Sequence, residues 1–138
     1  YISRFAAKHE AQLFCEEKTV EQALQDYFCA VATCFTSKDT PAGCFMINTS
    51  ATLAASSKEI ANTVKSRHAM QEETLSTFLA QRQQRGEIPA HCRPQELAQY
   101  LSCILQGMSI SAREGATLEK LQGITQTTLR LWPELLKL

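Results

Sequence analysis

The sequence has few residues that break helices and no excess of charge of either sign. Its 138 residues include 5 glycines and 4 prolines, and 14 basic side chains balance 14 acidic ones. A domain that grips a nucleic-acid backbone needs a clustered excess of lysine and arginine, so this chain is not expected to bind DNA by itself. No apolar run approaches the roughly 20 residues of a membrane-spanning helix. No signal-peptide pattern opens the chain, and we expect a cytoplasmic protein.

Motifs for catalysis and for metal binding are also missing. The sequence contains no GxSxG, HExxH, Walker or GxGxxG pattern. A di-iron bundle needs Glu-x-x-His pairs, but alanine, lysine and isoleucine stand at that spacing before His9, His68 and His91. We therefore expect no enzyme activity, no cofactor and no metal. A small helical enzyme remains a weaker alternative, because no nucleophile or acid–base pair is evident.

The six cysteines do not have the spacing of a disulfide scaffold. No CxxC pair occurs, and a chain of this length does not need disulfides to fold. Most of them fall on apolar helix faces, where a reduced cysteine packs as a small apolar residue. A thiol-redox sensor is the alternative, with Cys29 and Cys34, or Cys44, as the reactive groups.

Helical patterns fill the sequence, and strand patterns are nearly absent. Thr19 and Gln22 form a capping box, and Gly86 is suited to a left-handed cap at the end of the longest predicted helix. The pattern predicts an all-α fold of about six helices in one domain, arranged as an orthogonal or antiparallel bundle. The predicted helices cover residues 1–14, 19–35, 40–53, 57–85, 94–113 and a last one from Thr117, which Pro133 should kink or stop.

Two features of the first four predicted helices indicate more than a simple core. His68 and Gln71 interrupt the apolar face of the longest helix, where a buried amide is costly unless it is hydrogen-bonded. They are either core residues with internal partners or polar contacts within a ligand cavity. The short segment PAGCFMINTS, residues 41–50, has no polar face, which indicates an element enclosed by others.

The last two predicted helices are apolar on more than one side. Tyr100, Cys103, Gly107 and Ser111 form a second stripe, and the final helix is apolar over a wide arc. A helix with two apolar faces is buried on two faces. A twofold interface with a second copy of the chain explains this pattern; the alternative is that both helices lie at the centre of the monomer.

Several segments together resemble the C-terminal, effector-binding and dimerisation domain of TetR/AcrR-type transcriptional regulators. They are GCFMINTSATLA (residues 43–54), EIANTVKSRHAMQEETLSTFLAQRQQRGEIPA (59–90) and RPQELAQYLSCILQGMSISAREGATLEKL (93–121). The chain begins at Tyr1 inside a helical pattern and without methionine, so we expect a piece of a longer regulator. The family's helix-turn-helix would precede it, and no residue here is assigned to DNA contact.

The resemblance implies a small-molecule pocket among the first four helices and a homodimer formed by the last two as a four-helix bundle. The effector would be a small apolar or amphipathic molecule whose binding alters repression. The residues expected to line the pocket are Phe5, Phe28, Phe45, Asn48, Thr49, His68, Gln71 and Tyr100. Those expected at the dimer interface are Cys103, Gly107, Ser111, Leu121, Ile124, Thr128, Leu131 and Trp132.

Overall fold

The computed structural model describes residues 10, 11, 13–37 and 58–138. This part of the chain contains four α-helices and no strand: α2 (Val20–Phe35), α4 (Lys58–Gln84), α5 (Pro94–Arg113) and α6 (Leu118–Leu135). The predicted all-α class is confirmed. The described helices number four where about six were predicted, because the predicted helices over residues 1–14 and 40–53 lie mostly or wholly outside the described residues.

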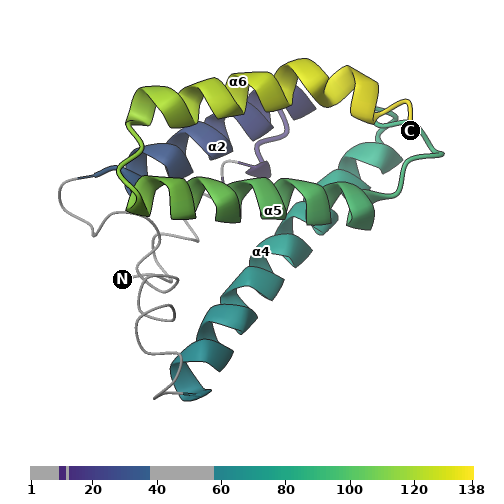
Figure 1. Ribbon diagram of the computed structural model, residues 1–138. Helices are drawn as coiled ribbons and strands as arrows, with labels where there is room; N and C mark the ends of the chain where they lie inside the picture. The colour runs from purple at the N-terminus through teal and green to yellow at the C-terminus, as the bar shows by residue number, and fades with distance from the viewer. Residues whose placement is uncertain (1–9, 12, 38–57) are drawn as a thin grey trace.

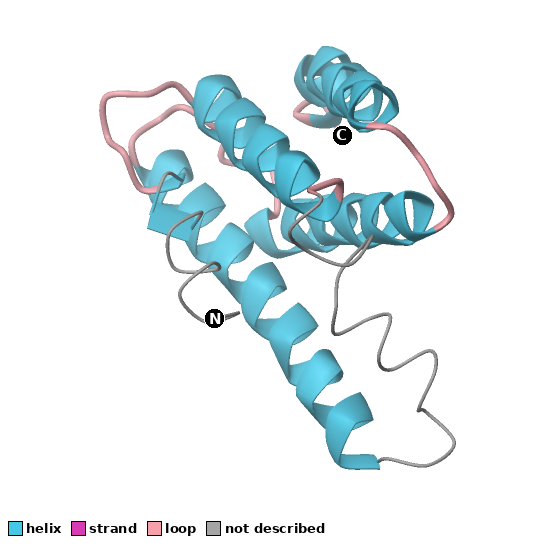
Figure 2. Ribbon diagram, turned by 90° about the vertical axis from the view of Figure 1, so that its left-hand side faces the viewer, coloured by secondary structure: helices cyan, strands magenta, loops and turns pink. Residues whose placement is uncertain are grey.

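The four helices form an antiparallel arrangement with one long diagonal member. Figure 1 shows α5 and α6 running in opposite directions, with α2 behind them and α4 crossing below. The helix α4 packs mainly against α5, and α2 packs mainly against α6 and also against α5. Figure 2 shows that the N-terminal half of α4 extends away from the other described helices. The C-terminal half of α4 therefore carries most of its packing.

The helix ends follow the sequence signals closely. The Thr19 hydroxyl accepts from the Gln22 amide, and the Gln22 side chain accepts from the Thr19 amide, both at 3.1 Å, which is the predicted capping box. Thr117 caps α6 in the same way through the Lys120 amide. At the other end of α4, Gly86 has a φ of 82°, in the left-handed region that glycine adopts without strain.

Pro133 was expected to kink or stop the last helix, and the stop does not occur. Pro133 does not stop α6, which continues to Leu135. A proline removes one amide donor and crowds one carbonyl four residues earlier. Only the last turn of the helix remains beyond Pro133, and the Leu136 amide still donates to the Trp132 carbonyl at 3.1 Å.

A continuous apolar core fills the space among the four helices. Its largest fully buried side chains include Phe28 of α2, Phe78 of α4, Leu101 and Met108 of α5, and Trp132 of α6. Each described helix contributes to it, so none folds as an isolated element. None of the described helices combines the length and the hydrophobicity needed to cross a membrane.

Two glycine substitutions should change stability in opposite directions. Gly86→Ala places a Cβ at a φ of 82°, and we expect it to lower the free energy of unfolding by about 1 kcal/mol. Gly123→Ala lies inside α6 with no atom within 4 Å of the new Cβ, and it should raise that free energy by roughly 0.5–1 kcal/mol. Urea unfolding followed by circular dichroism measures both. Equal effects of the two substitutions would contradict the cap at Gly86.

Candidate functional site

A polar cluster connects three helices in the middle of the bundle. The Gln71 amide of α4 donates to the Tyr27 hydroxyl of α2 at 3.3 Å, and its oxygen accepts from the Ser102 hydroxyl of α5 at 3.5 Å. Gln106, one turn along α5, donates to the same Ser102 oxygen at 3.4 Å. These four residues are called the Gln71 cluster below. Its hydrogen bonds are long, so each is a weak one.

Burial shifts the pKa values of three ionisable groups around this cluster toward their neutral forms. Burial raises the pKa of Tyr27 to about 12, although the hydrogen bond from Gln71 acts against the shift. His68 lies one turn before Gln71 and is half-buried, and burial lowers its pKa from 6.5. The pKa of Glu10 is raised by burial and lowered in part by Arg67. At neutral pH the cluster and His68 thus offer amide, hydroxyl and neutral imidazole groups.

The structure separates the residues that were predicted to line a pocket. Phe5, Phe45, Asn48 and Thr49 lie outside the described residues. Gln71 and His68 lie on neighbouring turns of α4, as expected. Phe28 instead lies in the core, where it lines a gap too narrow for water with Leu101, Thr128 and Trp132. Tyr100 lies on the outer side of α5 and is exposed.

Tyr27, Ser102 and Gln106 were not predicted from the sequence as site residues. Tyr27 lies on the apolar stripe of α2, next to Phe28, and a buried tyrosine hydroxyl usually has a partner. That rule identifies Tyr27 as a residue in need of a polar neighbour. It cannot identify Gln71 as the neighbour, because the two residues are 44 positions apart.

An exposed apolar row follows the outer side of α5 and continues on α6. Tyr100, Cys103, Gly107 and Ile110 lie three or four residues apart on α5, and all four are exposed. On α6 the row continues with the half-buried Ile124 and with Leu131, which is 43% exposed. These six residues are called the outer row. Apolar side chains aligned in this way favour a contact with another surface.

Three residues predicted at the dimer interface lie inside the protomer. Leu121, Thr128 and Trp132 are buried against the core, with Trp132 only 1% exposed. Their helix position is the reason: α6 turns this face toward α2, which packs against it. Ser111 is half-buried. Cys103, Gly107, Ile124 and Leu131 remain available on the outside.

None of the described cysteines forms a disulfide, and burial favours the protonated thiol in two of them. Burial raises the pKa of Cys92, and burial followed by the charge of Asp26 raises the pKa of Cys29. A raised pKa lowers the fraction of reactive thiolate. Cys29 and Cys34 lie five residues apart in α2, a rise of about 7.5 Å along the axis, which is too far for a disulfide in an intact helix. Cys44 lies outside the described residues.

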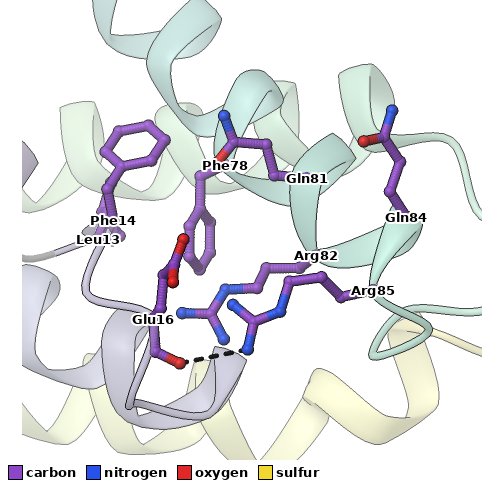
Figure 3. A pocket seen from close by; sticks show the side chains of 8 residues that line it. All are labelled: Leu13, Phe14, Glu16, Phe78, Gln81, Arg82, Gln84 and Arg85. Carbon is purple, nitrogen blue, oxygen red and sulfur yellow. Dashed lines mark hydrogen bonds between the residues drawn. The ribbon is translucent and has the colours of Figure 1, made fainter.

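A cleft of about 280 Å³ lies at the C-terminal end of α4. It is lined by Phe78, Gln81, Arg82 and Gln84 of α4, by Arg85 directly after α4, and by Leu13, Phe14 and Glu16. Figure 3 shows the guanidinium groups of Arg82 and Arg85 turned toward Glu16. Arg82 is 3% exposed and Arg85 is largely exposed. The cleft marks the place where the segment before α2 meets α4. Among the described residues, no three histidine, cysteine, aspartate or glutamate side chains are grouped as metal ligands.

Comparison with known proteins identifies the family. Residues 19–127 match the family described as "Tetracyclin repressor-like, C-terminal domain". Because the match covers most of the chain, the chain belongs to this family of C-terminal domains of TetR-type transcriptional regulators.

Two similar proteins agree with this assignment. The HTH-type transcriptional repressor ComR of Escherichia coli is 74% identical over 137 residues, which is 99% of this chain and 65% of that protein. The chain thus spans slightly less than two thirds of the length of this relative. A solved structure of a cysteine mutant of the TetR family transcriptional regulator CifR, complexed with double-strand operator DNA, has a TM-score of 0.83. It is 19% identical, with 96% of this chain and 69% of that chain covered, so it supports the fold.

The lowered pKa of His68 gives a specific dependence of stability on pH. The unfolded state takes up a proton near pH 6.5 and the folded state only at lower pH, so the free energy of unfolding should fall as the pH drops through 6.5. We expect a loss below about 1 kcal/mol, because solvent screens a half-buried group. Urea unfolding at several pH values measures it.

The variant His68→Asn is the control for this prediction. It should lack this part of the pH dependence and keep the opposite contribution of Glu10, whose raised pKa favours the folded state at low pH. Identical pH profiles of the variant and the unaltered chain would contradict the burial of His68.

Proposed function

We propose that this chain is the ligand-sensing and dimerisation part of a TetR-type transcriptional repressor. The observation that carries this proposal is the 74% identity to a repressor along almost the entire chain. The relative is longer and its name includes a helix-turn-helix, so DNA would be read by a segment outside this chain. The formal net charge of zero agrees with DNA binding by another segment, because this chain has no excess of basic residues. Such a regulator would work in the cytoplasm.

The Gln71 cluster is the proposed place where an effector makes its polar contacts. The cluster joins α2, α4 and α5, so a molecule that replaces its long hydrogen bonds would change how these helices are held together. A ligand shifts a conformational equilibrium only if it prefers one arrangement over the other. The groups offered by the cluster and by His68 are uncharged at neutral pH. We therefore propose an uncharged, amphipathic effector.

The outer row is the proposed dimer interface. In a twofold interface the same surface of both copies meets, so one self-complementary apolar row on α5 and α6 is sufficient. Four helices, two from each copy, would then form a bundle. The interface would comprise Tyr100, Cys103, Gly107, Ile110, Ile124 and Leu131, with the three buried residues of α6 supporting it from inside.

Grafting tests the repressor function. The chain should replace the matching 137 residues of the E. coli relative and still repress a reporter under that repressor's own operator. Ile110→Arg in the graft should relieve repression and convert the protein to a monomer in analytical ultracentrifugation, because two buried charges would face each other across the twofold axis.

Met70→Arg is the matched control for this graft. Met70 is 52% exposed and Ile110 is 46% exposed, but Met70 lies on α4, away from the outer row. The control should repress normally and remain a dimer. A dimeric, fully repressing Ile110→Arg graft would contradict the proposed interface.

The effector class can be tested with two probes of equal chain length, one with a neutral head group and one with a charged head group. Decanol should raise the thermal midpoint of the chain more than decanoate does, since transfer of a carboxylate from water to a site lined by the uncharged groups of the cluster is costly. Gln71→Ala should reduce the decanol effect, and Gln99→Ala, an exposed glutamine on α5, should not. Equal stabilisation by the two probes would contradict an uncharged effector.

A further inference from the structure

Arg82 connects the end of α4 to the turn that leads into α2. Its guanidinium Nη1 donates to the Lys18 carbonyl at 2.6 Å, and Nη2 donates to the Cys15 carbonyl at 2.9 Å. The side chain is 3% exposed, so these are buried, charge-assisted hydrogen bonds to two carbonyls of one turn. A planar guanidinium that holds two backbone atoms at once fixes both the position and the orientation of that turn.

Glu87 supplies the counter-charge from the turn after α4. Gly86 reverses the chain, and the Glu87 carboxylate then accepts from Nη1 of Arg82 at 3.0 and 3.2 Å. Arg85 adds an ion pair to Glu87 at 3.3 Å and donates to the Glu16 carbonyl at 3.2 Å. The turn before α2 and the turn after α4 are thus attached to the same buried charge.

Aromatic rings cover the remaining side of this contact. The Arg82 guanidinium carbon lies 5.3 Å from the centroid of the Phe78 ring, within the range of a cation–π contact. Phe14 meets Phe78 edge to face, with centroids 6.2 Å apart. Figure 3 shows Phe78 beside both Phe14 and the two arginines. Residues 13–18 are therefore held to α4 by apolar as well as polar contacts.

The same face of α4 carries the Gln71 cluster. Gln71 and Arg82 are eleven residues apart, which is about three full turns and returns the chain to the same side of the helix. At one end of this face Gln71 contacts Tyr27 in the middle of α2, and at the other end Arg82 contacts the turn that enters α2. A shift of α4 along or about its axis changes both contacts together.

We propose that Arg82 is a positioning residue that couples the Gln71 cluster to the turn before α2. The hydrogen bonds of Arg82 are short, so a displacement of α4 at Gln71 moves the carbonyls of Cys15 and Lys18 with it. This inference rests on the proposed function in one respect: the effector is the natural cause of the displacement. The coupling itself is a property of the chain and can be measured without a ligand.

A double-mutant cycle in the 138-residue chain tests the coupling. Amide hydrogen exchange is measured at Lys18, whose amide donates to Cys15 inside the turn. Gln71→Ala should speed this exchange about tenfold in the otherwise unaltered chain, because α4 is less firmly held and the turn opens more often. With Arg82→Lys present, Gln71→Ala should add nothing, since lysine cannot hold two carbonyls and a carboxylate in the same geometry.

Two controls separate coupling from general loss of stability. The Ala116 amide, which donates to the Ser111 carbonyl in the distant turn between α5 and α6, should exchange at an unchanged rate in every variant. Arg93→Lys changes an arginine that is 77% exposed and pairs with Glu96 at the start of α5; in that background Gln71→Ala should still speed exchange at Lys18. If circular dichroism shows that Arg82→Lys does not fold, Glu87→Gln replaces it in the cycle. Glu87→Gln should then reduce the increase in Lys18 exchange that Gln71→Ala causes.

Additive effects of Gln71→Ala and Arg82→Lys on the Lys18 amide would overturn the proposal. So would equal changes at Lys18 and Ala116, which would mean global destabilisation. Neither result affects the repression by the grafted chain described above. Conversely, a graft that fails to repress would leave the cycle unchanged, so the two proposals fail separately.

Discussion

The attachment of α4 at two points is the constraint on which the rest of the structure depends. One attachment is apolar and broad, where the C-terminal half of α4 packs against α5. The other is a buried charge, because Arg82 must have its carbonyl and carboxylate partners to remain in the core. Together they fix the angle at which α4 crosses the bundle and bring Gln71 to Tyr27. The exposed face of α5 stays free because α4 covers only its inner side.

The division of faces on α5 and α6 follows from the same arrangement. Each helix has one face in the protomer core and a second, apolar face outside it. Trp132 and Leu121 belong to the first face, and Leu131 belongs to the second. A position one residue further along a helix turns by about 100°, so neighbours such as Leu131 and Trp132 point to different surfaces. This is why a sequence pattern alone assigned both residues to one interface.

Local signals in the sequence predicted the helices well and the long-range contacts poorly. The capping box at Thr19 and the left-handed turn at Gly86 depend on residues within a few positions, so the printed sequence contains all that is needed. Arg82 stands in the last turn of α4, and no local pattern in the sequence identifies its partners. Its actual partners, Cys15 and Lys18, are 67 and 64 positions away, and only the packing of α4 brings them together. The residues proposed to contact an effector present the same difficulty: Phe28 and Tyr27 are adjacent on α2, and the crossing angle of α4 decides which one Gln71 meets.

The two polar sites of α4 differ in a way that suits a switch. The hydrogen bonds of the Gln71 cluster measure 3.3 to 3.5 Å, whereas Arg82 holds its carbonyls at 2.6 and 2.9 Å. Long bonds between neutral groups are replaced at little cost, and short bonds to a buried charge are not. An effector competing for the cluster would therefore break the weak contacts and leave the strong ones intact. The helix between them is rigid over three turns, so the disturbance would be passed on to the turn before α2 and would not be absorbed where the effector binds.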